Sequence, residues 1–166
     1  MAQSSNSGIF NARDFGATGD GDTKDSPAIQ SAIDACTATG GGVVLVPPGE
    51  YRCGTIHLKS HVVLEISAGA TLHYSTDEDD FEEPEELPYS PNSDVETAYF
   101  RFSLLFGQDA QNIAIQGPGA IEQHTYGRGG PKPMAFKNCQ DVTIRDFFIL
   151  NAPNYNISMI GCDNVT

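Results

Sequence analysis

Carboxylate side chains, which can bind cations or exchange protons, concentrate in one short segment of the chain. Residues 77–86 carry eight of them, and this run contains the only Asp-Asp pair of the sequence, Asp79-Asp80. Calcium prefers carboxylate oxygens, so the run first suggests a calcium site. Two other residues interrupt it, and an interrupted run of like charges is more typical of a solvated loop. We therefore expect an acidic loop within residues 73–99 and assign no metal ligand to it.

Other residue types that bind metals or act as nucleophiles are scattered along the chain. Residues 20–25 match the start of an EF-hand loop, but the twelfth position is Ser31 instead of glutamate, which favours a turn leading into a helix. The cysteines lack the Cys-x-x-Cys spacing of zinc and redox sites, and we interpret them as buried free thiols. They are Cys36, Cys53, Cys139 and Cys162. We expect no metal and no other cofactor.

The overall charge argues against two classes of partner. The 166 residues carry a formal net charge of −13 at pH 7. A protein this acidic is repelled by nucleic acid and by anionic membranes, so we expect it to bind neither. The densest apolar run, residues 43–46, is far shorter than a membrane span. Residues 1–7 lack the basic and apolar regions of a signal peptide, and the cellular location stays open.

One amphipathic helix is predicted near the N-terminus. Asp25 is a suitable capping residue, and Pro27 suits the first helical turn. Apolar residues then recur at helical spacing, at Ala28, Ile29, Ala32, Ile33 and Cys36. Because three glycines at residues 40–42 end the pattern, we expect a helix over residues 26–39.

Beyond this helix the apolar period changes to two, and the pattern repeats. Ile113 and Val142 occupy equivalent positions 29 residues apart, and Val142 and Val165 are 23 residues apart. Leu64 precedes Ile115 by 51 residues, which is about two such steps. Short strands at intervals of about 20 to 30 residues, without a second helical pattern, predict a solenoid of the all-β class. A parallel β-helix fits this pattern best.

A short polar residue precedes each of three repeated strands. These residues are Asn112, Asp141 and Asn164. Asn and Asp tolerate tight turns and can form hydrogen bonds with the next coil. We expect the three side chains to stack at one corner of the solenoid, where they are structural.

The chain is long enough for one domain, and we expect residues 1–166 to form a single partial β-helix domain. Residues 8–42 supply an N-terminal strand, a loop and the capping helix, and residues 43–166 supply the first coils. Because the pattern stops within a repeat at residues 164–166, we expect a solenoid truncated at its C-terminus. An open last coil exposes apolar side chains and unpaired strand groups, which favours self-association.

Segments along nearly the whole chain resemble one known family. Residues 14–17 read Asp-Phe-Gly-Ala, residues 40–51 contain Gly-Gly-Gly followed by Val-Val-Leu-Val-Pro-Pro-Gly-Glu-Tyr, and residues 151–155 read Asn-Ala-Pro-Asn-Tyr. Residues 26–34 and 112–119 extend the match. In this order they resemble the N-terminal region of polygalacturonases, glycoside hydrolase family 28, within the pectate-lyase-like superfamily. The resemblance implies a right-handed parallel β-helix with an N-terminal capping α-helix.

The same resemblance implies inverting hydrolysis of an α-linked galacturonan or a related pectic chain. Such hydrolysis needs one protonated carboxyl group for the leaving oxygen and one carboxylate to activate water. The family supplies them from Asn-Thr-Asp and Asp-Asp motifs, supported by Gly-His-Gly and Arg-Ile-Lys. None of the four is present as such, since Asp79-Asp80 lies inside the acidic run. The motifs would follow residues 151–153, so we nominate no catalytic residue and expect this segment alone to be inactive.

Basic and aromatic residues near the later strands are the candidates for substrate binding. We nominate His124, Arg128 and Tyr155 for contact with a pectic polysaccharide or an oligogalacturonide. Arginine matches a carboxylate with two hydrogen bonds, and an aromatic ring offers a flat face to a pyranose. Tyr126 and Lys132 are a further aromatic and a further basic residue in this region. The bland interpretation is loop solvation for the basic residues and packing for the tyrosines.

Two other functions stay open. Another β-helix enzyme, such as a polysaccharide lyase, would need calcium and a basic residue, and a chelator would distinguish it from a hydrolase. A β-helix used for binding or assembly, as in a surface or tail fibre, would bind polysaccharide without turnover or self-associate. The family is usually secreted or periplasmic, although residues 1–7 show no signal peptide.

Overall fold

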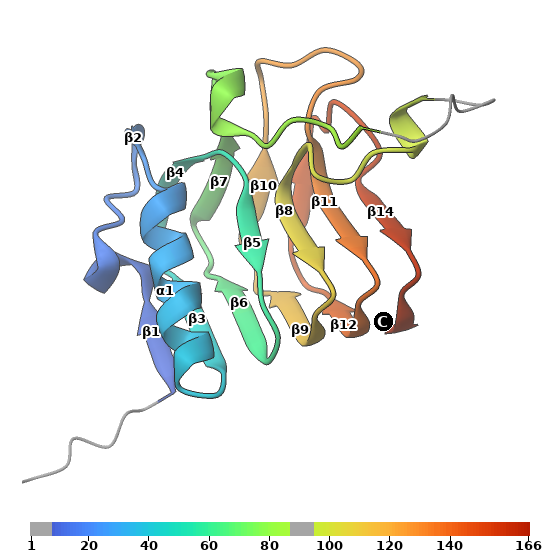
Figure 1. Cartoon of the computed structure of the whole chain (residues 1–166). Coiled ribbons are helices and arrows are strands. Elements are labelled where there is room, and N and C mark those ends of the chain that lie inside the picture. The colour runs from blue at the N-terminus through green and yellow to red at the C-terminus, as the bar shows by residue number, and fades with distance from the viewer. Residues whose placement is uncertain (1–7, 87–94) are drawn as a thin grey trace, which may run out of the picture.

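A computed structural model of the protein describes residues 8–86 and 95–166. Short parallel strands from successive coils stack along one axis into a solenoid, and α1 (Ser26–Ala38) lies against its first coils (Figure 1). Two expectations concern residues outside this description, namely the signal-peptide analysis of residues 1–7 and the part of the acidic loop at 87–94. Within the described ranges, every helix is too short or too polar to cross a membrane.

Three parallel sheets form the walls of the solenoid. The first contains β1 (Ile9–Asn11), β3 (Gly42–Val46), β6 (Val62–Ile66), β9 (Gln111–Gln116), β12 (Gln140–Ile144) and β15 (Asp163–Val165). The second contains β2 (Asp20–Lys24), β4 (Gly49–Cys53), β7 (Ala70–Tyr74), β10 (Ala120–Glu122) and β13 (Phe148–Leu150). The third contains β5 (Ile56–Leu58), β8 (Ser103–Gln108), β11 (Lys132–Lys137) and β14 (Ile157–Ile160). The short helical turns are η1 (Ala12–Phe15), η2 (Glu78–Asp80) and η3 (Val95–Thr97).

The strand register explains the sequence repeats. Val142 pairs with Ile113 on one side and with Val165 on the other, so the 29- and 23-residue repeats each correspond to one coil. Leu64 pairs directly with Ile115. The 51-residue spacing is therefore a single coil, and its interpretation as two steps was wrong. The additional residues form an insertion between β7 and β8, which a period count cannot distinguish from a second coil.

The predicted ladder of Asn and Asp side chains is confirmed. Asn112, Asp141 and Asn164 have φ angles of 54°, 53° and 55°, in the left-handed region that short polar residues tolerate. Asn164 Nδ2 donates a hydrogen bond to Asp141 Oδ1 at 2.9 Å, and Asn112 Nδ2 lies 3.2 Å from His61 Nδ1. These contacts join neighbouring coils at one corner, as the structural interpretation requires.

Helix α1 covers the solenoid at its N-terminal end, as predicted. Its buried side chains are Ser26, Ile29, Ala32, Ile33 and Cys36. The helix spans Ser26–Ala38, one residue shorter than the sequence pattern suggested. By covering the interior of the first coils, it protects apolar surface and strand edges that would otherwise be exposed.

Asp25 does not cap this helix with its side chain, so that prediction was wrong. The carboxylate is fully buried and accepts hydrogen bonds from Thr18 N at 2.7 Å and Gly19 N at 3.0 Å. The backbone oxygen of Asp25 accepts the first helical hydrogen bonds instead, including one from Ile29 N at 3.0 Å. The carboxylate therefore fixes the loop before β2 to the start of α1.

The predicted turn at residues 20–25 is an irregular strand, β2, with a local turn inside it. The Asp20 carboxylate accepts hydrogen bonds from Thr23 N at 2.7 Å, Thr23 Oγ1 at 2.8 Å and Asp22 N at 3.0 Å. Led by the bond from the Thr23 amide, these interactions lower the pKa of Asp20 to about 2. The Asp20 carboxylate thus stabilises the backbone of a turn.

The acidic run is only partly a solvated loop. Five of its eight carboxylate residues are exposed, as predicted: Asp77, Glu78, Asp79, Glu83 and Glu86. The other three are half-buried and bind partners on the solenoid. Asp80 accepts hydrogen bonds from Lys24 and Ser75, and Glu82 lies 2.9 Å from His57 Nε2. The insertion is therefore attached to the coils that it crosses.

Glu85, the third of these, binds the other end of the insertion. Its Oε2 atom accepts hydrogen bonds from Phe100 N and Arg101 N, both at 2.9 Å. Burial raises the pKa of the Glu85 carboxyl group, but these amides outweigh burial and leave the pKa below its usual value. The two halves of the insertion thus meet beside the third sheet.

The cysteines are unpaired thiols in the structure. Cys36, Cys53 and Cys139 are buried, as predicted, whereas Cys162 on the last coil is only half-buried. Burial raises the pKa of the Cys53 thiol, which keeps it protonated and unreactive.

Candidate functional site

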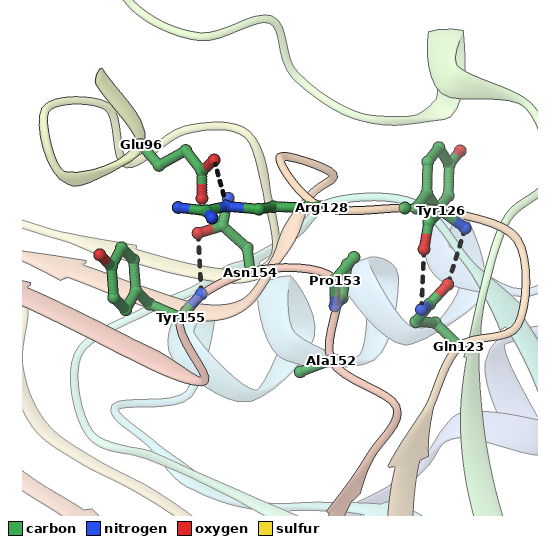
Figure 2. A pocket seen from close by; sticks show the side chains of 9 residues that line it. Glu96, Gln123, Tyr126, Arg128, Ala152, Pro153, Asn154 and Tyr155 are labelled. Atoms are coloured by element: carbon green, nitrogen blue, oxygen red, sulfur yellow. Dashed lines mark hydrogen bonds and ion pairs between the residues drawn. The ribbon is translucent and has the colours of Figure 1, made fainter. Parts of the chain in front are cut away.

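A pocket lies where the chain passes from the second sheet to the third. Two consecutive turns form it, one between β10 and β11 and one between β13 and β14, together with η3 of the insertion (Figure 2). Its volume is about 430 Å³. The lining residues are Glu96, Gln123, Tyr126, Gly127, Arg128, Ala152, Pro153, Asn154 and Tyr155. Loops at strand ends, held by a rigid scaffold, are frequent positions for binding residues.

Gln123 shapes the first turn from a buried position. Its Oε1 atom accepts hydrogen bonds from Tyr126 N at 2.7 Å and Thr125 N at 2.9 Å, and its Nε2 atom donates to Tyr126 O at 3.0 Å (Figure 2). Tyr126 in turn donates from its hydroxyl to Ser75 O at 2.9 Å. Burial, assisted by the nearby carboxylate of Glu78, raises the pKa of Tyr126 and keeps this donor protonated.

Asn154 joins the second turn to the first. Its Nδ2 atom donates to Gly130 O at 3.0 Å and to the Tyr99 hydroxyl at 2.9 Å, while Oδ1 accepts from Tyr155 N at 2.7 Å. A Cβ atom on Gly130 would lie 2.6 Å from the Cβ of Tyr126 and 3.1 Å from that of Pro153. Glycine is therefore required where the two turns approach each other.

Arg128 and Tyr155, two of the three nominated residues, line this same pocket. The Arg128 side chain is 82% exposed, and its Nε atom lies 3.3 Å from Glu96 Oε1 (Figure 2). The Tyr155 ring is also exposed. The pocket thus places a guanidinium group, suited to a carboxylate, near a ring suited to a sugar face.

The third nominated residue, His124, is not part of this pocket. It borders a smaller hollow of about 190 Å³ on the second sheet. Its Nε2 atom lies 3.0 Å from Glu122 Oε1, and its ring centroid lies 6.5 Å from that of His73. The sequence pattern around residues 124–128 did not indicate that the turn directs the His124 side chain away from Arg128.

Lys132, which the sequence suggested as a loop residue, is fully buried at the start of β11. Its Nζ atom donates to Tyr99 O, so neither solvation nor direct sugar contact describes its position. Three other residues, Gln123, Asn154 and Glu96, belong to the site without having been nominated. Asn154 could have been nominated, because it lies in the Asn-Ala-Pro-Asn-Tyr segment that resembles the family. Glu96 could not, because only the fold of the insertion brings it to the pocket.

The pocket is equipped for binding more than for acid–base chemistry. Glu96 is the single carboxylate residue among the described residues that line it, whereas glycoside hydrolysis requires two carboxyl groups. Residues 8–86 and 95–166 contain no cluster of His, Cys, Asp and Glu arranged to hold a metal ion. The described lining thus combines one guanidinium group, aromatic rings and one carboxylate.

A family model described as rhamnogalacturonase A/epimerase, pectate lyase-like, matches residues 9–162. The chain belongs to this family. The match covers strands of all three sheets and both turns of the pocket, and it confirms the expected pectate-lyase-like group.

Relatives of this rhamnogalacturonase/epimerase-family chain act on different polymers. Mannuronan C5-epimerase AlgE3 of Azotobacter vinelandii is 65% identical in an alignment of 70 positions that covers 37% of this chain and 4% of the relative. The exo-poly-alpha-D-galacturonosidase of Dickeya chrysanthemi is 35% identical in an alignment of 124 positions that covers 72% of this chain and 20% of the relative. The chain thus spans a fifth or less of the length of either relative.

A solved structure confirms the architecture of the family chain. The hyperthermoactive exopolygalacturonase of Thermotoga maritima superposes with a TM-score of 0.79 at 22% identity, covering 95% of this chain and 45% of that one. The expected right-handed parallel β-helix with an N-terminal helix is therefore correct. The resemblance to polygalacturonases noted in the sequence is also confirmed, because relatives of the chain carry that name.

Proposed function

We propose that this chain is the N-terminal part of a polygalacturonase-like glycoside hydrolase and that its pocket binds one uronic acid residue of a pectic chain. The observation that carries the proposal is the convergence of Arg128 and Tyr155 on one pocket. In this proposal the guanidinium group binds the sugar carboxylate, and the tyrosine ring packs on the pyranose. His124 stays a predicted contact, at a separate hollow.

The proposal assigns the two catalytic carboxyl groups to residues that follow position 166. The family motifs are absent from residues 1–166, and the pocket itself contains one carboxylate residue, Glu96, among its described lining residues. Hydrolysis by inversion would use one of the missing groups as the acid and the other as the base. The segment alone is expected to bind its ligand without turnover, and residues 1–166 are proposed to be one partial domain.

A second candidate is recognition of a mannuronan chain for epimerisation. The 65% identity to a mannuronan C5-epimerase over 70 residues favours it. Both polymers present a carboxylate on each sugar, so Arg128 would serve either. Parallel binding titrations with oligogalacturonate and oligomannuronate distinguish the two candidates by which oligomer binds more tightly.

Replacement of Arg128 by glutamine tests the proposed site. We expect Arg128→Gln to weaken oligogalacturonate binding at least about tenfold, because a hydrogen-bonded charged pair is lost. Titration calorimetry at low salt measures the change, since surface electrostatics weaken as salt rises. Methyl-esterified oligomers, which lack the carboxylate charge, are expected to bind the wild-type chain as weakly as the acidic oligomer binds the variant.

The matched control is Arg145→Gln. Arg145 is an exposed arginine that donates to Gln116 Oε1 from Nε at 3.1 Å and from Nη2 at 2.8 Å, outside the pocket. This variant is expected to retain wild-type affinity. Equal affinities of both variants, or no preference for the acidic oligomer, would contradict the proposed role of Arg128.

We also propose that the 166-residue segment by itself self-associates through its last coil. Several large apolar side chains are exposed on β13, β14 and β15: Phe148, Leu150, Ile157, Ile160 and Val165. A second copy would cover these side chains and pair the open strands. Sedimentation velocity is expected to show mass increasing with concentration, and Ile160→Lys is expected to shift the protein toward the monomer. A wild-type monomer at all concentrations would refute this proposal.

A further inference from the structure

Lys132 occupies a position that is unusual for a lysine. It lies at the start of β11 with 0% of its surface exposed. Lysine is almost never fully buried without partners, because transfer of an ammonium group out of water is costly. Its burial therefore points to a specific use of the charge.

Three described contacts of the Lys132 ammonium group lie on the last part of the insertion. Nζ donates to Tyr99 O at 2.5 Å and lies 4.7 Å from the Tyr99 ring centroid and 4.9 Å from that of Phe100. Both distances are within the range of cation–π attraction. The backbone amide of Lys132 also donates to Phe102 O at 3.0 Å. One residue thus holds residues 99–102 against the solenoid through its backbone and its side chain.

The Tyr99 side chain connects the segment held by Lys132 to the two turns that form the pocket. Its hydroxyl accepts from Asn154 Nδ2 at 2.9 Å and donates to Gly129 O at 3.3 Å. Gly129 N in turn donates to Pro153 O at 3.0 Å. The hydroxyl therefore contacts both turns that form the pocket, although Tyr99 itself does not line it.

The same segment determines where Glu96 lies. Phe100 packs with Phe106 and Ala135 in a small cluster separate from the main core, and its amide donates to Glu85. Glu96 precedes this attachment by four residues and meets Arg128 at the pocket. A shift of residues 99–102 would therefore separate Glu96 from Arg128 and break the hydrogen bond between Asn154 and Tyr99.

We propose that Lys132 is a positioning residue for the pocket and acts on the ligand through Tyr99. This inference rests on the proposed binding function, because its main readout is the affinity of the pocket for oligogalacturonate. Lys132 does not contact the ligand. Its ammonium group holds Tyr99, and Tyr99 holds the two turns and the insertion in the arrangement that presents Arg128.

The test compares Lys132→Met, Tyr99→Phe and the double variant in the same 166-residue chain. Methionine keeps the length of the side chain and removes the charge, and phenylalanine keeps the ring and the carbonyl and removes the hydroxyl. We expect each single variant to weaken oligogalacturonate binding about fivefold. The double variant is expected to lose no more than the stronger single variant, because both changes interrupt one sequence of contacts. A general structural role would instead give additive losses.

Lys59→Met is the matched control, because Lys59 is half-buried and its ammonium group pairs with Asp34 of α1 at 2.7 Å, away from the insertion. It is expected to leave affinity unchanged. If Lys132→Met fails to fold, Tyr99→Phe still tests the sequence of contacts, since it keeps the lysine and its acceptor. Wild-type affinity in Tyr99→Phe, or additive losses in the double variant, would overturn the proposal.

Hydrogen exchange separates this inference from the proposed function. The amides of Phe100 and Arg101 donate to Glu85 when the segment is in place, and Lys132→Met is expected to accelerate their exchange. Failure of the wild-type chain to bind any uronate oligomer would refute the proposed function alone. Unchanged exchange of these amides in Lys132→Met would refute the positioning role, whatever the wild-type chain binds.

Discussion

Replacement of Phe136 by alanine is expected to lower the free energy of unfolding by about 3–5 kcal/mol. Phe136 is fully buried in β11, where it pairs in register with Gly107 on one side and Met159 on the other. A Cβ atom on Gly107 would lie 2.9 Å from Phe136 Cδ1, so the ring occupies the space that the glycine leaves. Removal of the ring creates a cavity between coils that the paired backbones cannot close.

Urea denaturation followed by circular dichroism measures this change. The control is Ile9→Ala, because Ile9 lies in β1, away from the last coil, with 53% of its surface exposed. We expect that variant to change stability by less than about 0.5 kcal/mol. Similar losses in the two variants would show that the interior column between coils does not dominate the stability of this solenoid.

Asp25→Ala is expected to cost about 3 kcal/mol of stability, because it leaves buried amides without their charged acceptor. The carboxylate of Asp25 is fully buried and binds Thr18 N and Gly19 N on its two oxygens. Water cannot replace it without opening the loop against α1. Asp25→Asn keeps one acceptor oxygen but directs an amide donor at a second donor, so an intermediate loss is expected.

The control for this prediction is Asp22→Ala in the neighbouring turn. Asp22 is exposed, and the turn uses its backbone amide, which the substitution retains. Thermal unfolding of the three variants at one pH is expected to rank Asp22→Ala nearest to wild type and Asp25→Ala lowest. If Asp22→Ala were as damaging as Asp25→Ala, burial of the carboxylate would not be the cause.

Local patterns predicted the regular parts of this fold well. Alternating apolar residues indicated the strands, and the 29- and 23-residue repeats matched the register of Val142 with Ile113 and Val165. Such patterns succeed because each coil buries the same face of each strand, so period and burial coincide. The Asn ladder was predictable for the same reason, since its members occur once in each coil.

The errors concern residues whose partners are distant in the sequence. Asp25 has the residue type and position of a helix cap, but a loop that passes beside it supplies better donors. Lys132 is a residue type expected in a solvated loop, yet the rings of Tyr99 and Phe100, which belong to the insertion, pack against its ammonium group. The 51-residue spacing was misread because length alone cannot separate an insertion from a second coil.

The candidate site shows the same division. Arg128 and Tyr155 were nominated by chemistry, and the stacking of coils brings them to one pocket although 27 residues separate them. His124, only four residues from Arg128, faces a different hollow because the buried Gln123 side chain directs the turn. Glu96 reaches the pocket only because the insertion is attached to the third sheet.

The sequence by itself determined the solenoid, its capping helix, its polar corner and the family, because these depend on periodic burial and on local motifs. Only the tertiary structure decided which polar groups are buried and which side chains meet at the pocket. The physical reason is that a buried charge is stable only beside partners that surround it in space. In this chain those partners come from an insertion and from neighbouring coils, and sequence distance carries no information about them.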